Sequence, residues 1–126
     1  MLVVVPGGGE SRARGQEAAR LLLAGGRGST AIVCVNDLLA LGVLRALHVA
    51  GVRVPAEVSV AGMGGFADLS PPHMLLTTMA DDYHQIGREA GRLILERIDG
   101  RRTGSPERRI VEARLRRGET TGPAPE

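Results

Sequence analysis

The chain has 126 residues, of which 43% are hydrophobic and 24% are charged, and its formal net charge is +2. This length predicts one domain that buries about two-thirds of its unfolded surface, and the composition is that of an ordinary globular protein. With one Phe, one Tyr and no Trp, the core must be aliphatic, and a single cysteine excludes a disulfide framework. We find neither a transmembrane segment nor a signal peptide, so we expect a cytoplasmic protein without a membrane partner.

The first half of the chain alternates short apolar runs with helical patterns. Runs at 2–5, 31–35 and 57–61 predict strands, and the segments 11–23 and 37–50 predict helices. Strands that are continuously apolar favour a sheet covered on both faces, and alternation with helices favours parallel crossovers. The sequence therefore predicts a three-layer α/β fold with a mainly parallel sheet flanked by helices.

The second half begins with an irregular segment at 62–76, which is long for a loop in a compact domain and typical of a functional one. A short strand is predicted at 77–79, a helix at 82–98 and a half-exposed edge strand at 109–115. We expect one domain over 1–118, followed by a disordered tail over 119–126.

Three loops follow the predicted parallel strands, at 7–10, 36–37 and 62–66. The carboxyl ends of parallel strands share one edge of the sheet, so these loops predict a ligand cleft there. Asn36 can both donate to and accept from a sugar hydroxyl. Either Asn36 or Asp37 can cap the following helix, and for Asp37 we expect a mainly structural role.

Enzyme chemistry finds no support in the sequence. The glycines at 7–9 and 62–65 fit neither a P-loop nor a complete dinucleotide fingerprint, although a nucleotide-dependent enzyme is one alternative. His48, His73 and His84 lie far apart in the sequence, without metal-ligand spacing. We therefore predict no catalytic residue, no metal site and no cofactor.

One stripe of the helix at 37–50 is predicted to be a dimer interface. Leu39, Val43, Ala46 and Ala50 can cover the sheet, which leaves a second stripe at helical spacing formed by Leu38, Leu41, Arg45 and His48. Exposed leucines in one stripe are unusual on a monomer, so we expect a homodimer. The alternative is that the C-terminal segment covers the stripe.

Several segments, taken in order, resemble the effector-binding domain of the lactose-repressor/galactose-repressor (LacI/GalR) family of transcription regulators. They are AIVCVNDLLALGVLRAL at 31–47, VRVPAEVSVAG at 52–62, LTT at 76–78 and IGREAGRLILERIDG at 86–100. The resemblance implies one lobe of a periplasmic-binding-protein-like (type I) clamshell that closes on a sugar or nucleobase. It also implies that this sequence lacks the family's helix-turn-helix and nearly all of the first lobe.

The resemblance also implies a set of ligand-binding positions. Asn36 is retained, whereas Glu10 stands where the family usually has a stacking aromatic, and Gly64 where it has a carboxylate. Asp81 stands in the place of a common Gln. We therefore expect a sensor module that binds a sugar-like effector weakly and reaches DNA only through a helix-turn-helix absent from this chain. The alternatives are a stand-alone sugar-binding protein and a truncated remnant without independent function.

Overall fold

The structure is a computed structural model that describes residues 9, 11–26, 28–66 and 74–125. The chain divides into two compact units. The first comprises Met1–Ala80 and Leu115–Glu126, and the second comprises Asp81–Arg114. The strand expected at 2–5 lies outside the described residues.

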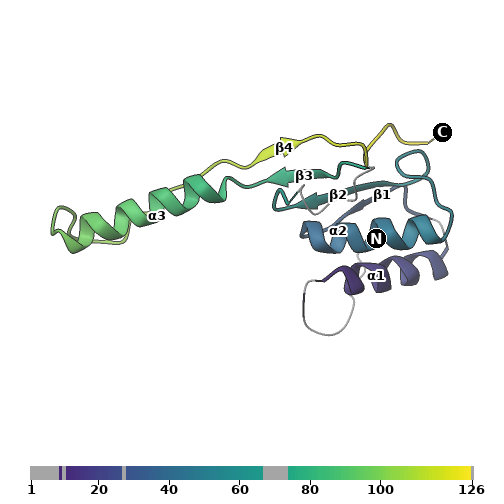
Figure 1. The fold of residues 1–126 in the computed structure, drawn as a ribbon, viewed down its shortest axis with the longest axis horizontal. Helices are drawn as coiled ribbons and strands as arrows, with labels where there is room; N and C mark the ends of the chain where they lie inside the picture. The colour runs from purple at the N-terminus through teal and green to yellow at the C-terminus, as the bar shows by residue number, and fades with distance from the viewer. Residues whose placement is uncertain (1–8, 10, 27, 67–73, 126) are drawn as a thin grey trace. The chain divides into compact units, whose positions relative to one another are not determined.

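The first unit is an α/β sheet structure (Figure 1). Its elements are α1 (Arg12–Ala24), β1 (Ala31–Val33), α2 (Asp37–Val49), β2 (Ser59–Met63), β3 (Thr77–Ala80) and β4 (Arg114–Arg116). The sheet has the order β1-β2-β3-β4, with β1 parallel to β2 and β2 parallel to β3. The α/β class, the mainly parallel sheet and the flanking helices are therefore confirmed. The edge strand expected at 109–115 is shorter than predicted and shifted to β4.

Side-chain caps start both helices of this unit, as the sequence suggested. The Ser11 hydroxyl accepts a hydrogen bond from the Arg14 amide at 3.3 Å and caps α1. Asn36 caps α2 by accepting from the Leu39 amide at 2.8 Å. Such caps satisfy amides that lack an intrahelical partner, so the polar residues decide where each helix begins.

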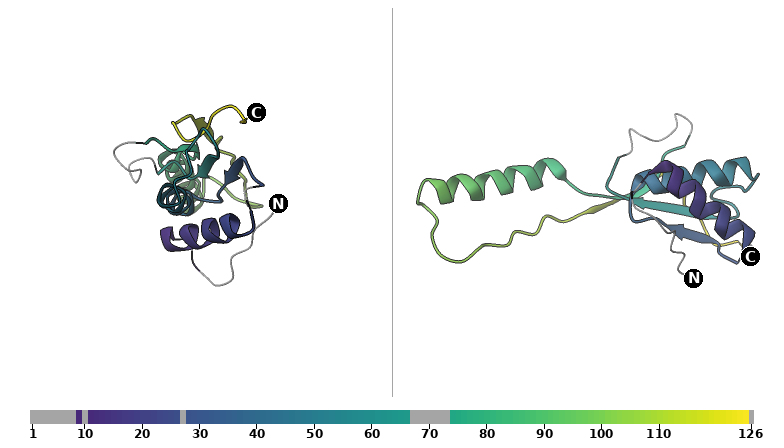
Figure 2. Two further views of the ribbon diagram at one scale, coloured as in Figure 1. Left: turned by 90° about the vertical axis from the view of Figure 1, so that its right-hand side faces the viewer. Right: turned by 90° about the horizontal axis from the view of Figure 1, so that it is seen from below.

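The two helices approach each other unusually closely, at a pair of glycines. A Cβ built on Gly15 would lie 2.1 Å from the Leu39 carbonyl oxygen, and one on Gly42 would lie 2.0 Å from the Arg12 carbonyl oxygen. Both helices lie on the same side of the sheet (Figures 1 and 2). Helix α2 is thus enclosed by two elements, the sheet and α1.

This double enclosure corrects the predicted faces of α2. Leu41, expected to be exposed in the dimer stripe, is only 6% exposed and belongs to the core. It lies one helical turn beyond Asp37, which contacts the sheet, so both point to the same side. Leu38 is half-buried, while Arg45 and His48 are exposed as predicted.

The core is aliphatic, as the composition required. Its buried members are Ala19, Cys34, Ala40, Leu41, Val43, Leu44, Ala46, Leu47, Val52, Val58, Val60 and Leu76. Strand side chains alternate between faces. Val33 and Met63 therefore lie on the face opposite to that of the partly buried Ile32. Both are substantially exposed. Helices α1 and α2 therefore cover one face of the sheet, and apolar side chains occupy the other. The described residues of this unit thus do not show the three-layer arrangement, with both faces covered, that the apolar strands predicted.

The segment after β4 packs into the sheet, which corrects the expectation of a disordered tail from Glu119. Thr120 is fully buried. Its hydroxyl donates to the Val60 carbonyl at 2.6 Å and accepts from the Thr77 amide at 2.9 Å. Its carbonyl accepts from the Val60 amide at 2.7 Å. These bonds tie the segment to β2 and β3, because buried amides and carbonyls need partners.

The second unit is built around α3 (Tyr83–Ile98), which Asp82 caps by accepting from the Gln85 amide at 2.8 Å. Within this unit the Arg102 guanidinium pairs with both Glu96 and Glu107. None of the α3 residues is buried, and Ile94 and Ile98 are largely exposed. No helix in the described part of the chain is long and apolar enough to span a membrane.

Candidate functional site

Two of the three predicted rim loops meet at the carboxyl end of the parallel strands. The first is Asn36-Asp37, which follows β1, and the second is Gly64–Phe66, which follows β2. The Phe66 amide donates to Asp37 Oδ2 at 2.6 Å, so the two loops are in direct contact. We call these residues, Asn36-Asp37 and Gly64–Phe66, the rim.

Within the rim, Asn36 and Asp37 have different roles. The Asn36 Oδ1 atom caps α2, which holds this half-buried side chain at the end of the sheet. Asp37 is fully buried and faces β3, where its Oδ1 accepts from the Thr78 hydroxyl at 2.6 Å. The sequence predicted a structural Asp37, but it did not reveal the partner. The signals in the sequence were the second capping residue beside Asn36 and the two threonines in the strand predicted at 77–79.

Gly64 and Gly65 adopt backbone conformations that favour glycine. Their φ angles are +121° and +82°, both in the region that side chains disfavour. A Cβ on Gly65 would also lie 2.9 Å from the Ala80 Cβ. An aspartate at position 64 would therefore be strained here, so the missing carboxylate cannot be restored by substitution alone.

The amides of this glycine-rich loop are occupied by the protein. The Gly64 amide donates to the Met79 carbonyl at 2.8 Å, and the Gly65 amide donates to the Thr78 hydroxyl at 3.3 Å. Phosphate-binding loops need amides that point at the ligand. The amides of Gly64, Gly65 and Phe66 point into the protein instead, which argues against the nucleotide alternative for this loop.

The other two predicted ligand residues do not belong to the part of the first unit that the structure describes. Glu10 lies outside the described residues. Asp81 belongs to the second unit, where it is exposed and accepts a hydrogen bond from the Tyr83 hydroxyl at 3.3 Å. Asn36 and Gly64 are therefore the predicted ligand residues that the structure places at one edge of the sheet.

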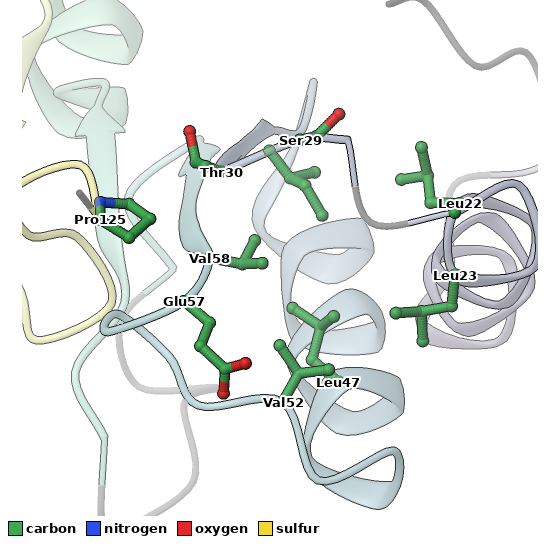
Figure 3. Close-up of a pocket in the computed structure, with 11 residues that line it drawn as sticks. Leu22, Leu23, Ser29, Thr30, Leu47, Val52, Glu57, Val58 and Pro125 are labelled. Atoms are coloured by element: carbon green, nitrogen blue, oxygen red, sulfur yellow. The ribbon is translucent and has the colours of Figure 1, made fainter.

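A hollow of about 260 Å³ lies at the other end of the strands (Figure 3). Its walls are mainly apolar and come from the ends of α1 and α2 and the starts of β1 and β2, and its lining includes Leu22, Leu23, Leu47, Val52 and Val58. Ligands of open parallel sheets bind at the carboxyl ends of the strands. The hollow is therefore distinct from the rim.

Cys34 sits in the core beside the rim and has no reactive character. Burial, and to a lesser extent the negative charge of Asp37, raises the pKa of the Cys34 thiol to about 11. Because the thiolate is the reactive form, this thiol is inert at neutral pH. Within the described ranges no three His, Cys, Asp or Glu side chains group together in a way that could hold a metal ion.

A mainly parallel sheet flanked by helices defines an α/β domain, and in folds of this class ligands bind beyond the carboxyl ends of the strands. The chain belongs to the periplasmic binding protein-like domain family, whose model matches residues 3–121. Its relatives are LacI-family regulators, which confirms the resemblance seen in the sequence.

Two curated relatives illustrate the match. The chain is 40% identical over 100 residues to the HTH-type transcriptional regulator MalR of Streptomyces coelicolor, covering 77% of this chain and 27% of MalR. It is 36% identical over 110 residues to the HTH-type transcriptional repressor CytR of Escherichia coli, covering 84% of this chain and 31% of CytR. The chain thus spans less than a third of either relative.

Solved structures show the same fold. A LacI family transcriptional regulator from Arthrobacter sp. FB24, in complex with lactose, superposes with a TM-score of 0.81 at 35% identity, over 90% of this chain and 43% of that chain. The complex of the transcriptional regulator CelR with cellobiose gives a TM-score of 0.78 at 32% identity, over 90% of this chain and 34% of that chain. Both of these regulators were solved as complexes with a sugar.

Proposed function

We propose that this chain is the effector-binding part of a LacI-type transcription regulator that acts in the cytoplasm and takes a small, polyhydroxylated ligand at the rim. The observation that carries the proposal is the contact between the Asn36-Asp37 loop and Gly64–Phe66 at the carboxyl end of the sheet. Two solved regulators with this fold are complexes with lactose and with cellobiose, so sugars are the first ligands to test. In such a regulator we expect a helix-turn-helix, and not the residues that the structure describes, to contact DNA.

Affinity for sugars is expected to be weak. Gly64 supplies no carboxylate to bind ligand hydroxyls. A hydrogen bond to a charged group contributes about 1.5–3 kcal/mol of stabilisation. We expect Kd values of about 1 mM or weaker for lactose or cellobiose, which corresponds to roughly 4 kcal/mol of binding free energy. NMR titration of the chain with either sugar measures this. The shifted amides should gather at Asn36 and Gly64–Phe66.

The matched variant for this titration is Asn36→Ser. Serine can still cap α2, so the fold should survive. The substitution removes the side-chain amide of Asn36 that we propose contacts the ligand. We expect the sugar-induced shifts to shrink in Asn36→Ser. Shifts that gather around the hollow near Leu47 and Val52, or no shifts at a saturating sugar concentration, would refute the proposed function and favour a remnant without effector binding.

A stand-alone sugar-binding protein is the second candidate, and the regulators among the relatives make it the weaker one. Both candidates predict the same rim, because the ligand would meet the same loops. They differ in self-association, since a regulator that reads paired half-sites needs a two-fold partner.

We further propose a homodimer through the outer side of α2, on a narrower surface than the sequence suggested. Arg45, His48 and Val49 are exposed there, with Val49 at 73%. The half-buried Leu38 lies about two helical turns before Arg45. Such a contact would be isologous, with each residue facing the same stripe of its partner. Light scattering on wild type and Val49→Asp tests it: we expect a dimer that becomes monomeric. A wild-type monomer at high micromolar concentration, or a variant that still dimerises, would rule out this surface.

A further inference from the structure

The fully buried carboxylate of Asp37 is the least expected feature of the rim. Burying an ionised carboxylate costs several kcal/mol unless hydrogen bonds compensate for the lost water. Here Oδ1 accepts from the Thr78 hydroxyl and Oδ2 accepts from the Phe66 amide, both at 2.6 Å. Both carboxylate oxygens therefore have a hydrogen-bond partner, one on β3 and one in the loop after β2.

The surrounding backbone is shaped to admit this carboxylate. A Cβ built on Gly62 would lie 2.3 Å from Asp37 Oδ1, so glycine is needed there. The Thr78 hydroxyl also accepts from the Gly65 amide at 3.3 Å, while donating to Asp37. Two consecutive loop amides, those of Gly65 and Phe66, thus depend on one threonine and one aspartate.

Asp37 is not needed to start the helix, because Asn36 already supplies the N-cap. A well-packed apolar pair would stabilise a core as well as a buried polar pair does. An apolar pair, however, could not accept hydrogen bonds from the backbone amides of the loop. The distinctive consequence of Asp37 and Thr78 is therefore the position of Gly64–Phe66.

We propose that Asp37 and Thr78 are positioning residues for the effector rim. They fix the loop Gly64–Phe66 against the amino end of α2, so that Asn36 and the loop form one rigid wall of the site. This inference rests on the proposed function, because the rim is where that function places the ligand. Since the amides of Gly64, Gly65 and Phe66 are used within the protein, the wall suits an uncharged polyol and not a phosphorylated one.

The test compares two adjacent threonines of β3. Thr78→Val removes the hydroxyl that bonds Asp37 and Gly65. Thr77→Val is the matched control, because Thr77 is also buried, at 4% exposure, but its hydroxyl bonds Gly118 and Thr121 instead. Hydrogen exchange of individual amides, followed by NMR, reports the loop directly.

We expect Thr78→Val to speed exchange at Gly65 and Phe66 about fivefold or more, because about fivefold is the lower end of the effect of leaving a buried hydrogen-bonding partner unpaired. The exchange rate of the Val60 amide reports any general loss of stability. The result is therefore the acceleration of exchange at Gly65 and Phe66 relative to the acceleration at Val60. Thr78→Ser, which keeps the hydroxyl, should restore slow exchange. Thr77→Val should show no excess at the loop.

Titration with cellobiose adds the functional readout. The wild type and Thr77→Val should bind equally, and Thr78→Val about threefold or more weakly, as ordering of the loop becomes a cost of binding. Slow loop exchange or unchanged affinity in Thr78→Val, or an equal effect of Thr77→Val, would overturn the inference. If the wild type binds neither cellobiose nor lactose, the proposed function fails, and with it the role at an effector site, even where loop exchange responds as expected.

Discussion

Replacing Gly42 with alanine is expected to lower the free energy of unfolding by about 3 kcal/mol. The new Cβ would meet the Arg12 carbonyl oxygen at 2.0 Å, and a backbone atom cannot move aside as a flexible side chain can. The helices α1 and α2 would have to separate along their contact, which would loosen the buried Ala19 and Val43. Urea denaturation of the purified chain measures the loss.

Two companion variants give this prediction its control. Gly15→Ala should cost a similar amount, because its Cβ would meet the Leu39 carbonyl oxygen at 2.1 Å from the other side of the same contact. Gly28→Ala is the matched control in the same unit, because a Cβ there meets nothing within 4 Å. It should leave stability unchanged or raise it slightly. A wild-type denaturation midpoint for Gly42→Ala would mean that the helices do not touch as described.

The local signals in the sequence were sufficient to place most elements. Ser11 and Asn36 marked the helix starts, because a polar side chain that can cap an amide stands directly before an apolar pattern. The parallel pairing of β1 with β2 followed from apolar runs separated by a helix. These features depend on residues within a few positions of one another, which a single sequence displays.

The faces of α2 were not predictable in the same way. A helical pattern separates an apolar side from a polar one, but it does not tell how many elements enclose the apolar side. The apolar spacing predicts an exposed Leu41, because Leu39 and Val43 alone can cover a sheet. The glycine pair Gly15 and Gly42 determines which side of α2 faces the sheet, because it allows α1 to pack closely against α2 on another side. Nothing in the spacing of either glycine indicates that they meet.

The candidate site was predicted in outline only. The rule that ligands bind beyond the carboxyl ends of strands located Asn36 and Gly64 at one edge. The contacts of Asp37 with Thr78, 41 positions away, and with Phe66, 29 positions away, are long-range and leave no periodic trace. The available clue was that Asn36 and Asp37 can both cap the helix, whereas only Asn36 is needed as the cap.

Deleting residues 119–126 is expected to cost about 3 kcal/mol or more of unfolding free energy, because several buried polar groups lose their partners at once. A glycine-, proline- and glutamate-rich end suggests disorder, which would make the deletion harmless. The structure instead buries Thr120 between β2 and β3. Removing it leaves the Val60 amide, the Val60 carbonyl and the Thr77 amide without their partners. Thermal unfolding followed by circular dichroism measures the effect.

The control for this deletion is a shorter one that removes only residues 123–126 and keeps Thr120 in place. We expect it to unfold near the wild-type temperature, since it retains all three Thr120 bonds. A single replacement, Thr120→Val, removes the hydroxyl but keeps the chain, and should cost about 1–3 kcal/mol through the unpaired Val60 carbonyl and Thr77 amide. If the long deletion proves as stable as the short one, the segment does not complete the sheet, and the disordered tail expected from composition is correct.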